Sequence, residues 1–388
     1  MRLSGEPIVC FAKDWDDHPT SNTHVMRRLA ERSPVLWVSS IGMRRPRTTV
    51  RDGRRIVRKL ARALGGPRHV EAGLWVLAPL AVPLPHSPWA TAVNRRLLRA
   101  TIRRAARRIG MGPFQVWTFL PNTVDYVTDL DPTLLVYYCV DDWAHASGYD
   151  GPQLAALERR LCARADVVFA TSAGLVEAKR TINPNTHLVP HGVDHARFAR
   201  ALAPATPVAP EIAALPGPVI GVVGLLDDRI DVALLARLAM RHPDWSLVLV
   251  GPAHVDLRPL AAAHANVHLL GDVAHARLPE FLKAFTVALV PFVVNDYTRH
   301  VNPVKLREYL SAGLPVVSTD LPEVARQARW CRVARDHEAF VAAVESAVQH
   351  DSLAERLARS DAMCGETWDR RVAEIGRIVE RARHARAA

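Results

Sequence analysis

The sequence predicts an α/β protein made of two doubly wound, Rossmann-like domains, and three observations lead to this prediction. Short apolar runs alternate with helical patterns along most of the 388 residues. Several of these runs are continuously apolar, as in parallel strands that are buried on both faces. A stretch with five prolines at 201–218 separates two such series. Each series is long enough to bury a core of its own.

The first series supplies the N-terminal domain, which we place at residues 1–203. Its helical patterns are clearest at Thr23–Arg32, Ala92–Ile109 and Leu154–Ala165. The strands expected in this series are Ile8–Ala12, Val35–Ser39, Leu74–Leu77, Val116–Phe119, Leu134–Val140, Val167–Ala170 and His187–Val189.

The second series follows a proline-rich linker at 204–218 and forms a domain at 219–351. Its expected strands are Val219–Gly224, Ser246–Gly251, Val267–Leu270, Val287–Pro291, Pro315–Ser318 and Cys331–Val333. Helical patterns lie between them at Asp231–Arg241, Leu278–Phe285, Pro303–Ala312 and Ala339–Gln349. Residues 352–388 are expected to be helical to the end. Ligands of doubly wound domains bind at the carboxyl ends of the strands, so the default site is a cleft between the two domains.

Positive charge is concentrated in the first half of the chain. The net charge is +11, and residues 44–108 hold 17 Lys and Arg but only Asp52 and Glu71 as acids. Solvated helix faces are one interpretation, and contact with an anionic membrane is another. Nucleic acid would also need basic surface, but no nucleic-acid-binding motif accompanies the charge, so we expect no such partner.

The sequence also indicates where the protein works. Its five cysteines are dispersed and show no metal-ligand or redox spacing, as expected of reduced thiols. The most apolar stretch, Gly73–Val93, is interrupted by four prolines and is a poor membrane span. The N-terminus does not resemble a signal peptide. We therefore expect a cytoplasmic protein, with the inner face of the plasma membrane as a further possibility.

The segment VNPVKLREYLSAGLPVVST at 301–319 carries the most information. Asn302 is a good N-cap, Pro303 suits the first helical position, and Gly313 is a natural helix stop. The start of this helix would present free N–H groups and a positive dipole end, which suit a phosphate. Lys305 and Glu308 share a face: the lysine could meet a phosphate, and the glutamate could accept hydrogen bonds from a ribose diol. A capped helix with a surface ion pair is the competing interpretation.

The same segment resembles the donor-binding motif of family 4 glycosyltransferases (glycosyl transferases group 1), in particular a bacterial polysaccharide-biosynthesis branch. Residues 308–317 match the pattern E-A/Y-x-A-x-G-x-P-V-V. Three further elements follow the family's order: Ala165-Asp166-Val167-Val168 with Ser172, Pro190-His191-Gly192-Val193-Asp194 with Phe198, and the strand Val219–Gly224. The resemblance implies the GT-B fold, a retaining mechanism and C-terminal helices that cross back over both domains.

The resemblance also implies roles for individual residues. It places the donor in the second domain, with Glu308 on the ribose and the loop ahead of it, including Asn302, Pro303 and Val304, near the diphosphate and sugar. Two features depart from the family: His300 stands where a first Glu is usual, and the loop that starts at Gly224 lacks the usual Arg and Lys. Phosphate charge must then be met by Arg229, Arg299, Lys305 or helix N-termini. We expect Lys305, Glu308 and Arg299 to be catalytic.

Acceptor-binding candidates follow strands of the first domain. Asp14 and His18 lie in an acidic loop after the first strand, and Asp141, Asp142 and Trp143 end the strand at 134–140. Carboxylates can bind sugar hydroxyls, and a tryptophan ring can stack on a pyranose. His191 is a further candidate. Helix caps and solvated carboxylates are the alternative interpretation of these residues.

The sequence therefore predicts a glycosyltransferase that uses a nucleotide-diphosphate sugar, most readily a UDP- or GDP-sugar, in cell-surface or exopolysaccharide biosynthesis. The acceptor would be a saccharide or a polyprenyl-diphosphate-linked saccharide. We expect no metal and no cofactor. A nucleotide-sugar 2-epimerase and an inactive nucleotide-sugar-binding assembly protein remain alternatives.

Overall fold

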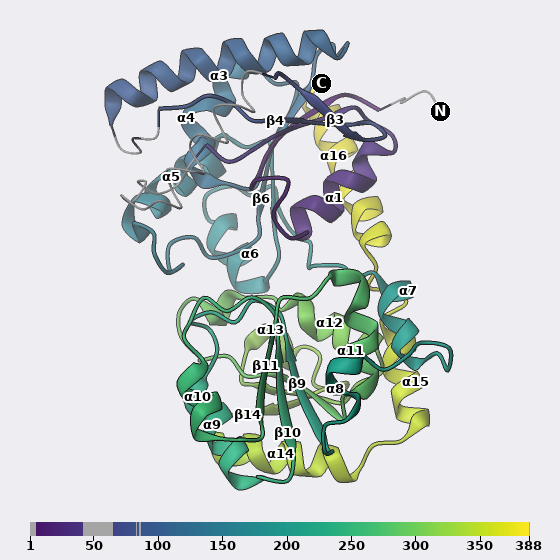
Figure 1. Cartoon of the computed structure of the whole chain (residues 1–388). Coiled ribbons are helices and arrows are strands. Elements are labelled where there is room, and N and C mark those ends of the chain that lie inside the picture. The colour runs from purple at the N-terminus through teal and green to yellow at the C-terminus, as the bar shows by residue number, and fades with distance from the viewer. Residues whose placement is uncertain (1–4, 42–64, 83, 85–86, 388) are drawn as a thin grey trace. The chain divides into compact units, whose positions relative to one another are not determined.

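The computed structural model describes residues 5–41, 65–82, 84 and 87–387, and the chain divides into two compact units (Figure 1). The first unit holds residues 1–190 and 372–388, and the second holds residues 191–371. Part of the basic stretch predicted from the sequence, residues 44–64, lies outside the described residues. Each unit is built on one sheet of mainly parallel strands, as the sequence predicts.

The sheet of the first unit has the strand order β3-β4-β2-β1-β5-β6-β7-β8. All neighbours pair in parallel except β3 and β4. The strands are β1 (Ile8–Phe11), β2 (Val35–Val38), β3 (Arg68–Glu71), β4 (Leu74–Leu77), β5 (Gln115–Thr118), β6 (Leu135–Cys139), β7 (Val167–Ala170) and β8 (Thr186–Leu188). The sequence does not predict β3, because this antiparallel edge strand is short, charged and partly exposed.

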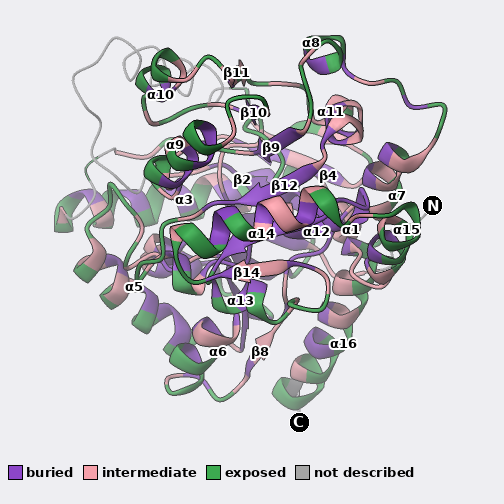
Figure 2. Cartoon of the chain, turned by 90° about the horizontal axis from the view of Figure 1, so that it is seen from below, coloured by how far each residue is buried: buried purple, intermediate pink, exposed green. Residues whose placement is uncertain are grey.

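Helices join these parallel strands, as crossover connections require. They are α1 (Ser21–Ala30), α3 (Pro88–Arg108), α4 (Val124–Val127), α5 (Gly151–Arg164) and α6 (Ala173–Arg180), with short 3-10 turns η1 (Pro121–Thr123) and η2 (Thr128–Leu130). Apart from the edge strands β3 and β8, the strands are largely buried, whereas helices such as α5 and α6 carry exposed residues on their outer sides (Figure 2).

The sheet of the second unit is fully parallel, in the order β11-β10-β9-β12-β13-β14. Its strands are β9 (Val219–Val223), β10 (Ser246–Val250), β11 (Val267–Gly271), β12 (Val287–Val290), β13 (Val316–Thr319) and β14 (Arg332–Ala334). Successive side chains of β9 enter different cores: Val219 and Val223 join one, and Ile220 and Val222 join the other. The sheet is therefore covered on both faces, which explains its continuously apolar strands.

Two sets of helices supply these two cores. Helices α9 (Val232–Arg241), α10 (Arg258–Ala263) and α14 (His337–Gln349) contribute to one core. The other core receives α7 (His195–Phe198), η3 (Ala199–Leu202), α8 (Pro210–Ala213), α11 (Leu278–Ala284), α12 (Val304–Ser311) and α13 (Pro322–Ala325). The short turns η4 (His275–Arg277) and η5 (Thr298–His300) and the C-terminal helices α15 (Leu353–Ala362) and α16 (Trp368–Ala387) complete the chain.

Three details differ from the expected organisation. The second unit begins at His191 rather than after the proline-rich stretch, because residues 193–212 pack into one of its cores. The stretch is itself partly helical, since Pro210 begins α8. The C-terminal helix is not continuous but stops between α15 and α16 at residues 363–367. The chain there pairs with Val193, which interrupts the helical hydrogen bonds.

Candidate functional site

The strongest candidate site lies in the second unit, at the end of β9. This strand pairs with β10 on one side and with β12 on the other, so the connections reverse direction beside it. Open parallel sheets bind ligands at such a point, beyond the carboxyl ends of the strands. The loops at 224–231 and 291–303 and the first turn of α12 meet at this edge, where Ile230 bridges to Phe292.

The end of β9 is held against α12 by one tyrosine. The Tyr309 hydroxyl accepts a hydrogen bond from the backbone N–H of Val223 (2.7 Å) and lies 3.1 Å from the carbonyl oxygen of the same residue. The next residue, Gly224, then lies against the Lys305 side chain: a β-carbon there would be 3.3 Å from Lys305 Cε. Gly251 at the end of β10 has a φ of +139°, and a β-carbon there would collide with the Gly224 carbonyl. The backbone of Gly224 therefore lies close both to the Lys305 side chain and to Gly251 at this edge of the sheet.

Lys305 and Glu308 form a partly buried ion pair on α12. Lys305 Nζ lies 2.6 Å from Glu308 Oε2, and the side chains are 27% and 8% exposed. His275 Nε2 lies 3.9 Å from the other carboxylate oxygen. Burial raises the pKa of Glu308, but the charge and hydrogen bond of Lys305 and the nearby His275 ring outweigh it, and the pKa falls to about 2. Glu308 is therefore an ionised hydrogen-bond acceptor. Because its side chain is buried, the pair is not an exposed surface ion pair, which was the competing interpretation of the sequence.

Asn302 does not cap α12, so that prediction is wrong. The N-cap residue is Pro303, and the Asn302 side chain instead accepts a hydrogen bond from Arg307 Nη1 (2.7 Å). Arg307 is buried and also reaches Glu366 (3.4 Å). Burial lowers the pKa of Arg307. The sequence alone did not identify Arg307 as a residue of the site. Its position directly before Glu308 in the motif is the one signal that points to it.

The remaining donor-site candidates lie in the surrounding loops. Arg229 pairs with Asp227 through two contacts of 2.8 Å and lies over the Phe292 ring, so its charge is already partly balanced. Arg299 is exposed in η5, and among the described residues it forms no ion pair. His300 ends η5 and is half-buried, and Val304 is the half-buried first residue of α12. Pro303 is buried.

Helix α15 fixes the other end of α12. Arg359 Nε donates to the Gly313 carbonyl (3.0 Å), and Ser360 Oγ donates to the Ser311 carbonyl (2.7 Å). These side chains satisfy carbonyl groups that a helix end leaves without partners. The C-terminal segment thereby positions the helix that carries Lys305 and Glu308.

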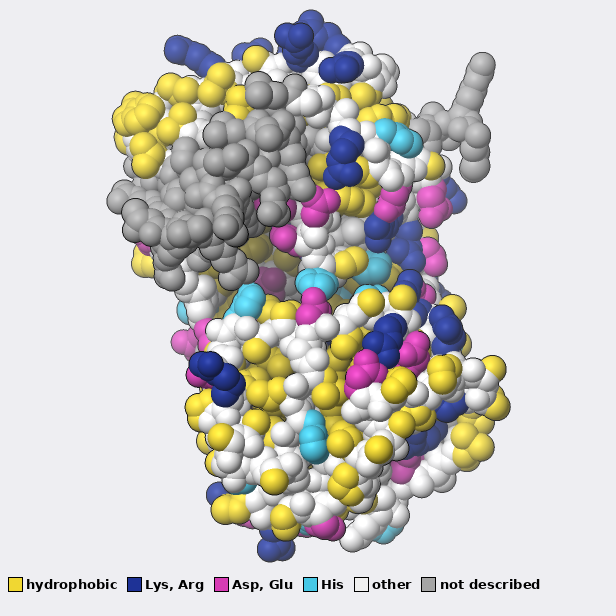
Figure 3. Space-filling view, viewed as in Figure 1, with side chains coloured by type: hydrophobic (Ala, Val, Ile, Leu, Met, Phe, Trp, Pro, Cys, Tyr) yellow, Lys and Arg dark blue, Asp and Glu magenta, His cyan; other side chains and the backbone are white. Residues whose placement is uncertain are grey.

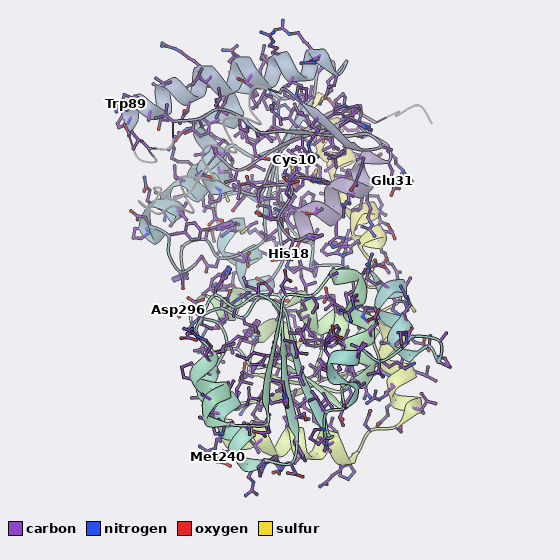
Figure 4. The ribbon with its side chains drawn as sticks, in the orientation of Figure 1. Cys10, His18, Glu31, Trp89, Met240 and Asp296 are labelled. Atoms are coloured by element: carbon purple, nitrogen blue, oxygen red, sulfur yellow. The ribbon has the colours of Figure 1, made fainter. Side chains whose placement is uncertain are left out.

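In the first unit, the acidic loop after β1 contains an unexpected cation. Lys13 Nζ donates to the His18 carbonyl, and Asp17 N–H donates to the Asp14 carbonyl (3.2 Å). Burial lowers the pKa of Lys13 to about 8, while Asp17 and Asp14 oppose this shift. The His18 side chain is exposed at the edge where the strands end (Figure 4). Lys13 thus lies close to the carboxylates of this loop.

The second group of acceptor candidates follows β6. Asp142 is buried and holds a turn: its Oδ1 accepts from Ala144 N–H (3.2 Å), and its Oδ2 lies 2.9 Å from His145 Nδ1. Asp141 is half-buried, and its carbonyl accepts a hydrogen bond from Cys139 Sγ. Trp143 contacts Tyr149 edge to face, and its buried Nε1 has no hydrogen-bond partner among the described residues.

His191, the remaining acceptor candidate, is the first residue of the second unit. Its ring packs beside Trp368, with centroids 6.1 Å apart. A β-carbon on the neighbouring Gly192 would lie 2.6 Å from the Trp368 nitrogen, so the backbone there needs glycine. The segment 190–194 therefore serves as a packing point between the start of the second unit and residues 366–368.

The described residues were also compared with the patterns of metal sites and membrane-spanning helices, and they show neither. No three His, Cys, Asp or Glu side chains in this part of the chain are grouped so that they could hold a metal ion. No helix within it has the length and apolar character needed to cross a bilayer. All five cysteines are free, and only Cys364 is exposed.

Comparison with known proteins shows similarity in sequence to a bacterial protein. A putative teichuronic acid biosynthesis glycosyltransferase, TuaH, from Bacillus subtilis (strain 168), is 28% identical to this chain over 234 residues. The alignment covers 54% of this chain and 57% of the relative, so the chain matches little more than half the length of that protein.

Several solved structures share the fold of nearly the whole chain. Sucrose-phosphate synthase from Thermosynechococcus elongatus matches 98% of this chain and 100% of its own, with a TM-score of 0.72 and 15% identity. Anabaena Alr3699/HepE in complex with UDP matches 96% of this chain and 99% of its own, with a TM-score of 0.67 and 12% identity. The predicted two-domain GT-B fold is thus confirmed.

The match to a protein family lies within the second unit, which carries Lys305 and Glu308. Residues 217–350 match the model for glycosyl transferases group 1. This range starts just before β9 and ends just after α14, and it includes the complete parallel sheet of the second unit. Residues 217–350 are therefore similar to the glycosyl transferases group 1 family, within a chain of GT-B fold.

Proposed function

We propose that this chain transfers a sugar from a nucleotide-diphosphate sugar to a saccharide or polyprenyl-diphosphate-linked acceptor during assembly of a cell-surface polysaccharide. The observation that carries the proposal is the ionised Glu308 beside Lys305 at the edge where β9 ends. An acceptor of hydrogen bonds and a cation lie within one helical turn there. This combination fits the ribose hydroxyls and the diphosphate of one donor molecule.

Donor binding would rearrange the charges at this site. The diphosphate would approach Gly224 and the N-terminal turn of α12, where backbone N–H groups and the helix dipole favour an anion. Lys305 is 27% exposed and can turn from Glu308 toward the phosphates. Glu308 would then accept hydrogen bonds from the ribose, and His275 would continue to support its charge.

The chemistry we propose depends on stabilising the leaving diphosphate. Negative charge builds up on the phosphate when the bond to the sugar breaks, and Lys305, Arg299 and the start of α12 would stabilise it. We propose retention at the anomeric carbon, with the leaving phosphate taking the acceptor's proton, and a reaction that needs no metal ion. Retention is supported by the motif at 308–317 alone.

The substrate class is supported by the similar proteins. The relative from Bacillus subtilis is named for teichuronic acid biosynthesis. UDP is named for the Anabaena structure, and ADP with acarbose for starch synthase IV from Arabidopsis thaliana. For this chain we propose a UDP- or GDP-sugar donor. Asp14, His18, Asp141, Asp142 and Trp143 are our candidates for the acceptor side, and we propose work at the cytoplasmic face of the membrane.

The first test is calorimetric titration of the purified chain with UDP, GDP, ADP and TDP. We expect one nucleotide to bind selectively, and Glu308→Ala to weaken it by about 10- to 100-fold, because a charged hydrogen-bond acceptor is lost. The matched control is Glu338→Ala, an exposed glutamate of α14. Absence of binding by all four nucleotides would refute the donor site.

The selected nucleotide then allows tests of turnover. Transfer to an added saccharide acceptor, unchanged by a chelator, would support the proposed reaction. Acceptor-independent conversion of the nucleotide sugar would instead identify a 2-epimerase. Tight binding without turnover on any acceptor would favour an inactive assembly protein.

A further inference from the structure

The outward face of α3 is the most unusual surface of the first unit. The inward face of this 21-residue helix buries Ala90, Leu98, Ile102, Ala105 and Ala106. An ordinary surface helix would then carry mixed charges on its other side. Helix α3 contains seven arginines and no acidic residue.

Apolar side chains gather on the outward face near the start of the helix. Trp89 is 58% exposed, Leu97 is 42% exposed and Val93 is 38% exposed, and the spacing of four residues places them along one side. Leu84, in the segment before the helix, is also exposed. Trp89 projects from the end of α3 (Figure 4), and hydrophobic atoms form a patch at that place on the surface (Figure 3).

Five of the seven arginines of α3 show two kinds of surroundings. Arg95 forms an ion pair with Asp129, and Arg103 donates to the Leu130 carbonyl, so these two serve the fold. Arg96, Arg104 and Arg107 are exposed, and none of them forms an ion pair within the described part of the chain. At 100° per residue they lie on the same side as Trp89. Dark blue side chains follow α3 in Figure 3.

We propose that this face of α3, defined by Trp89, Val93, Arg96, Leu97 and Arg104, lies on the surface of an anionic bilayer. The apolar side chains would insert among the headgroups, and the arginines would meet lipid phosphates. An amphipathic helix with a basic polar side and an aromatic residue has the composition of an interfacial helix. Charge of a single sign favours an anionic lipid surface over a protein partner.

The inference extends the proposed function, because a polyprenyl-linked acceptor is held at such a surface. It can be tested separately, since vesicle binding needs neither donor nor acceptor. A failure of nucleotide binding would leave this inference standing, and a failure of vesicle binding would leave the donor site standing.

The experiment is sedimentation of the full chain with phosphatidylcholine vesicles, with and without phosphatidylglycerol. We expect binding only to the anionic vesicles. The double variant Trp89→Ser/Leu97→Ser should lower the partition coefficient by about tenfold or more, because two large apolar side chains no longer leave water. Arg96→Gln/Arg104→Gln should lower it by about fivefold per charge, with less effect at high salt.

The matched control is Met240→Ser/Leu353→Ser, which removes two exposed apolar side chains from the second unit and should bind like the unchanged chain. All the substituted side chains are exposed, and circular dichroism would check that each variant folds. Equal binding by Trp89→Ser/Leu97→Ser would overturn the inference and assign binding to charge elsewhere. A change in sedimentation coefficient of that variant without vesicles would also overturn it, because the face would then be a contact between copies.

Discussion

Replacing Glu308 by glutamine removes a buried negative charge while keeping the size and hydrogen-bonding shape of the side chain. In the folded chain the pKa of this carboxyl group falls from 4.5 to about 2, although burial alone would raise it. Each pKa unit corresponds to about 1.4 kcal/mol, so the ionised group contributes about 3 kcal/mol at neutral pH. Lys305 is 27% exposed and can turn toward water in the variant, which lowers the expected loss to about 2 kcal/mol.

The contribution has a defined pH dependence. A carboxyl group with a lowered pKa stabilises the fold above its unfolded pKa, and this stabilisation is lost as the pH falls through the folded pKa. The difference between wild type and Glu308→Gln should therefore be full at pH 7. Applying the same pKa values, it should fall to less than half of its neutral value at about pH 3.

The assay is urea unfolding at both pH values, with hydrogen exchange of peptides from 304–314 as the readout. This local readout is needed because the two units need not unfold together. A destabilisation equal at both pH values would refute the reasoning, since it would show that the charge of Glu308 does not stabilise α12. An unchanged stability at pH 7 would refute it as well.

Three further predictions concern the framework of the two units. Lys179→Met leaves Glu158 buried without its 2.9 Å partner, so urea unfolding of the first unit should show a loss of about 3–5 kcal/mol, and Glu158→Gln in the same chain should restore much of it. Tyr309→Phe removes the hydrogen bond to the backbone at the end of β9, which should cost about 1–3 kcal/mol in unfolding experiments and weaken nucleotide binding; normal binding would contradict the positioning role. Gly192→Ala places a β-carbon 2.6 Å from the Trp368 nitrogen and should lower the melting temperature of the second unit, whereas Gly376→Ala, where a β-carbon meets nothing within 4 Å, should not.

Much of the fold could be predicted from local patterns. The strands expected at Val167–Ala170 and Leu74–Leu77 agree residue for residue with β7 and β4. Most other strand ends differ by one residue. These runs are buried on both sides of a sheet, so each position must be apolar, and the run itself shows where the strand begins and ends. Strand β3 lacks this signal because it lies at an exposed edge.

The candidate site was only partly predictable. Lys305 and Glu308 are three residues apart on a helix, so their contact follows from helix geometry. The approach of His275 to Glu308 joins residues that are far apart in the sequence. The same holds for Arg307 and Glu366, and for Tyr309 and Val223. Contacts between residues so far apart in the sequence leave no periodic pattern from which they could be predicted.

The sequence by itself determined the alternation of strands and helices, the strand positions and the helix that carries Lys305 and Glu308, because these depend on spacing within one element. Only the tertiary structure decided that Glu308 is buried and ionised, that Asn302 supports Arg307 rather than capping α12, and that His191 belongs to the second unit. Each of these depends on which distant segments pack together. Burial and charge at one residue are set by all the groups around it, and the chain brings those groups together only when it folds.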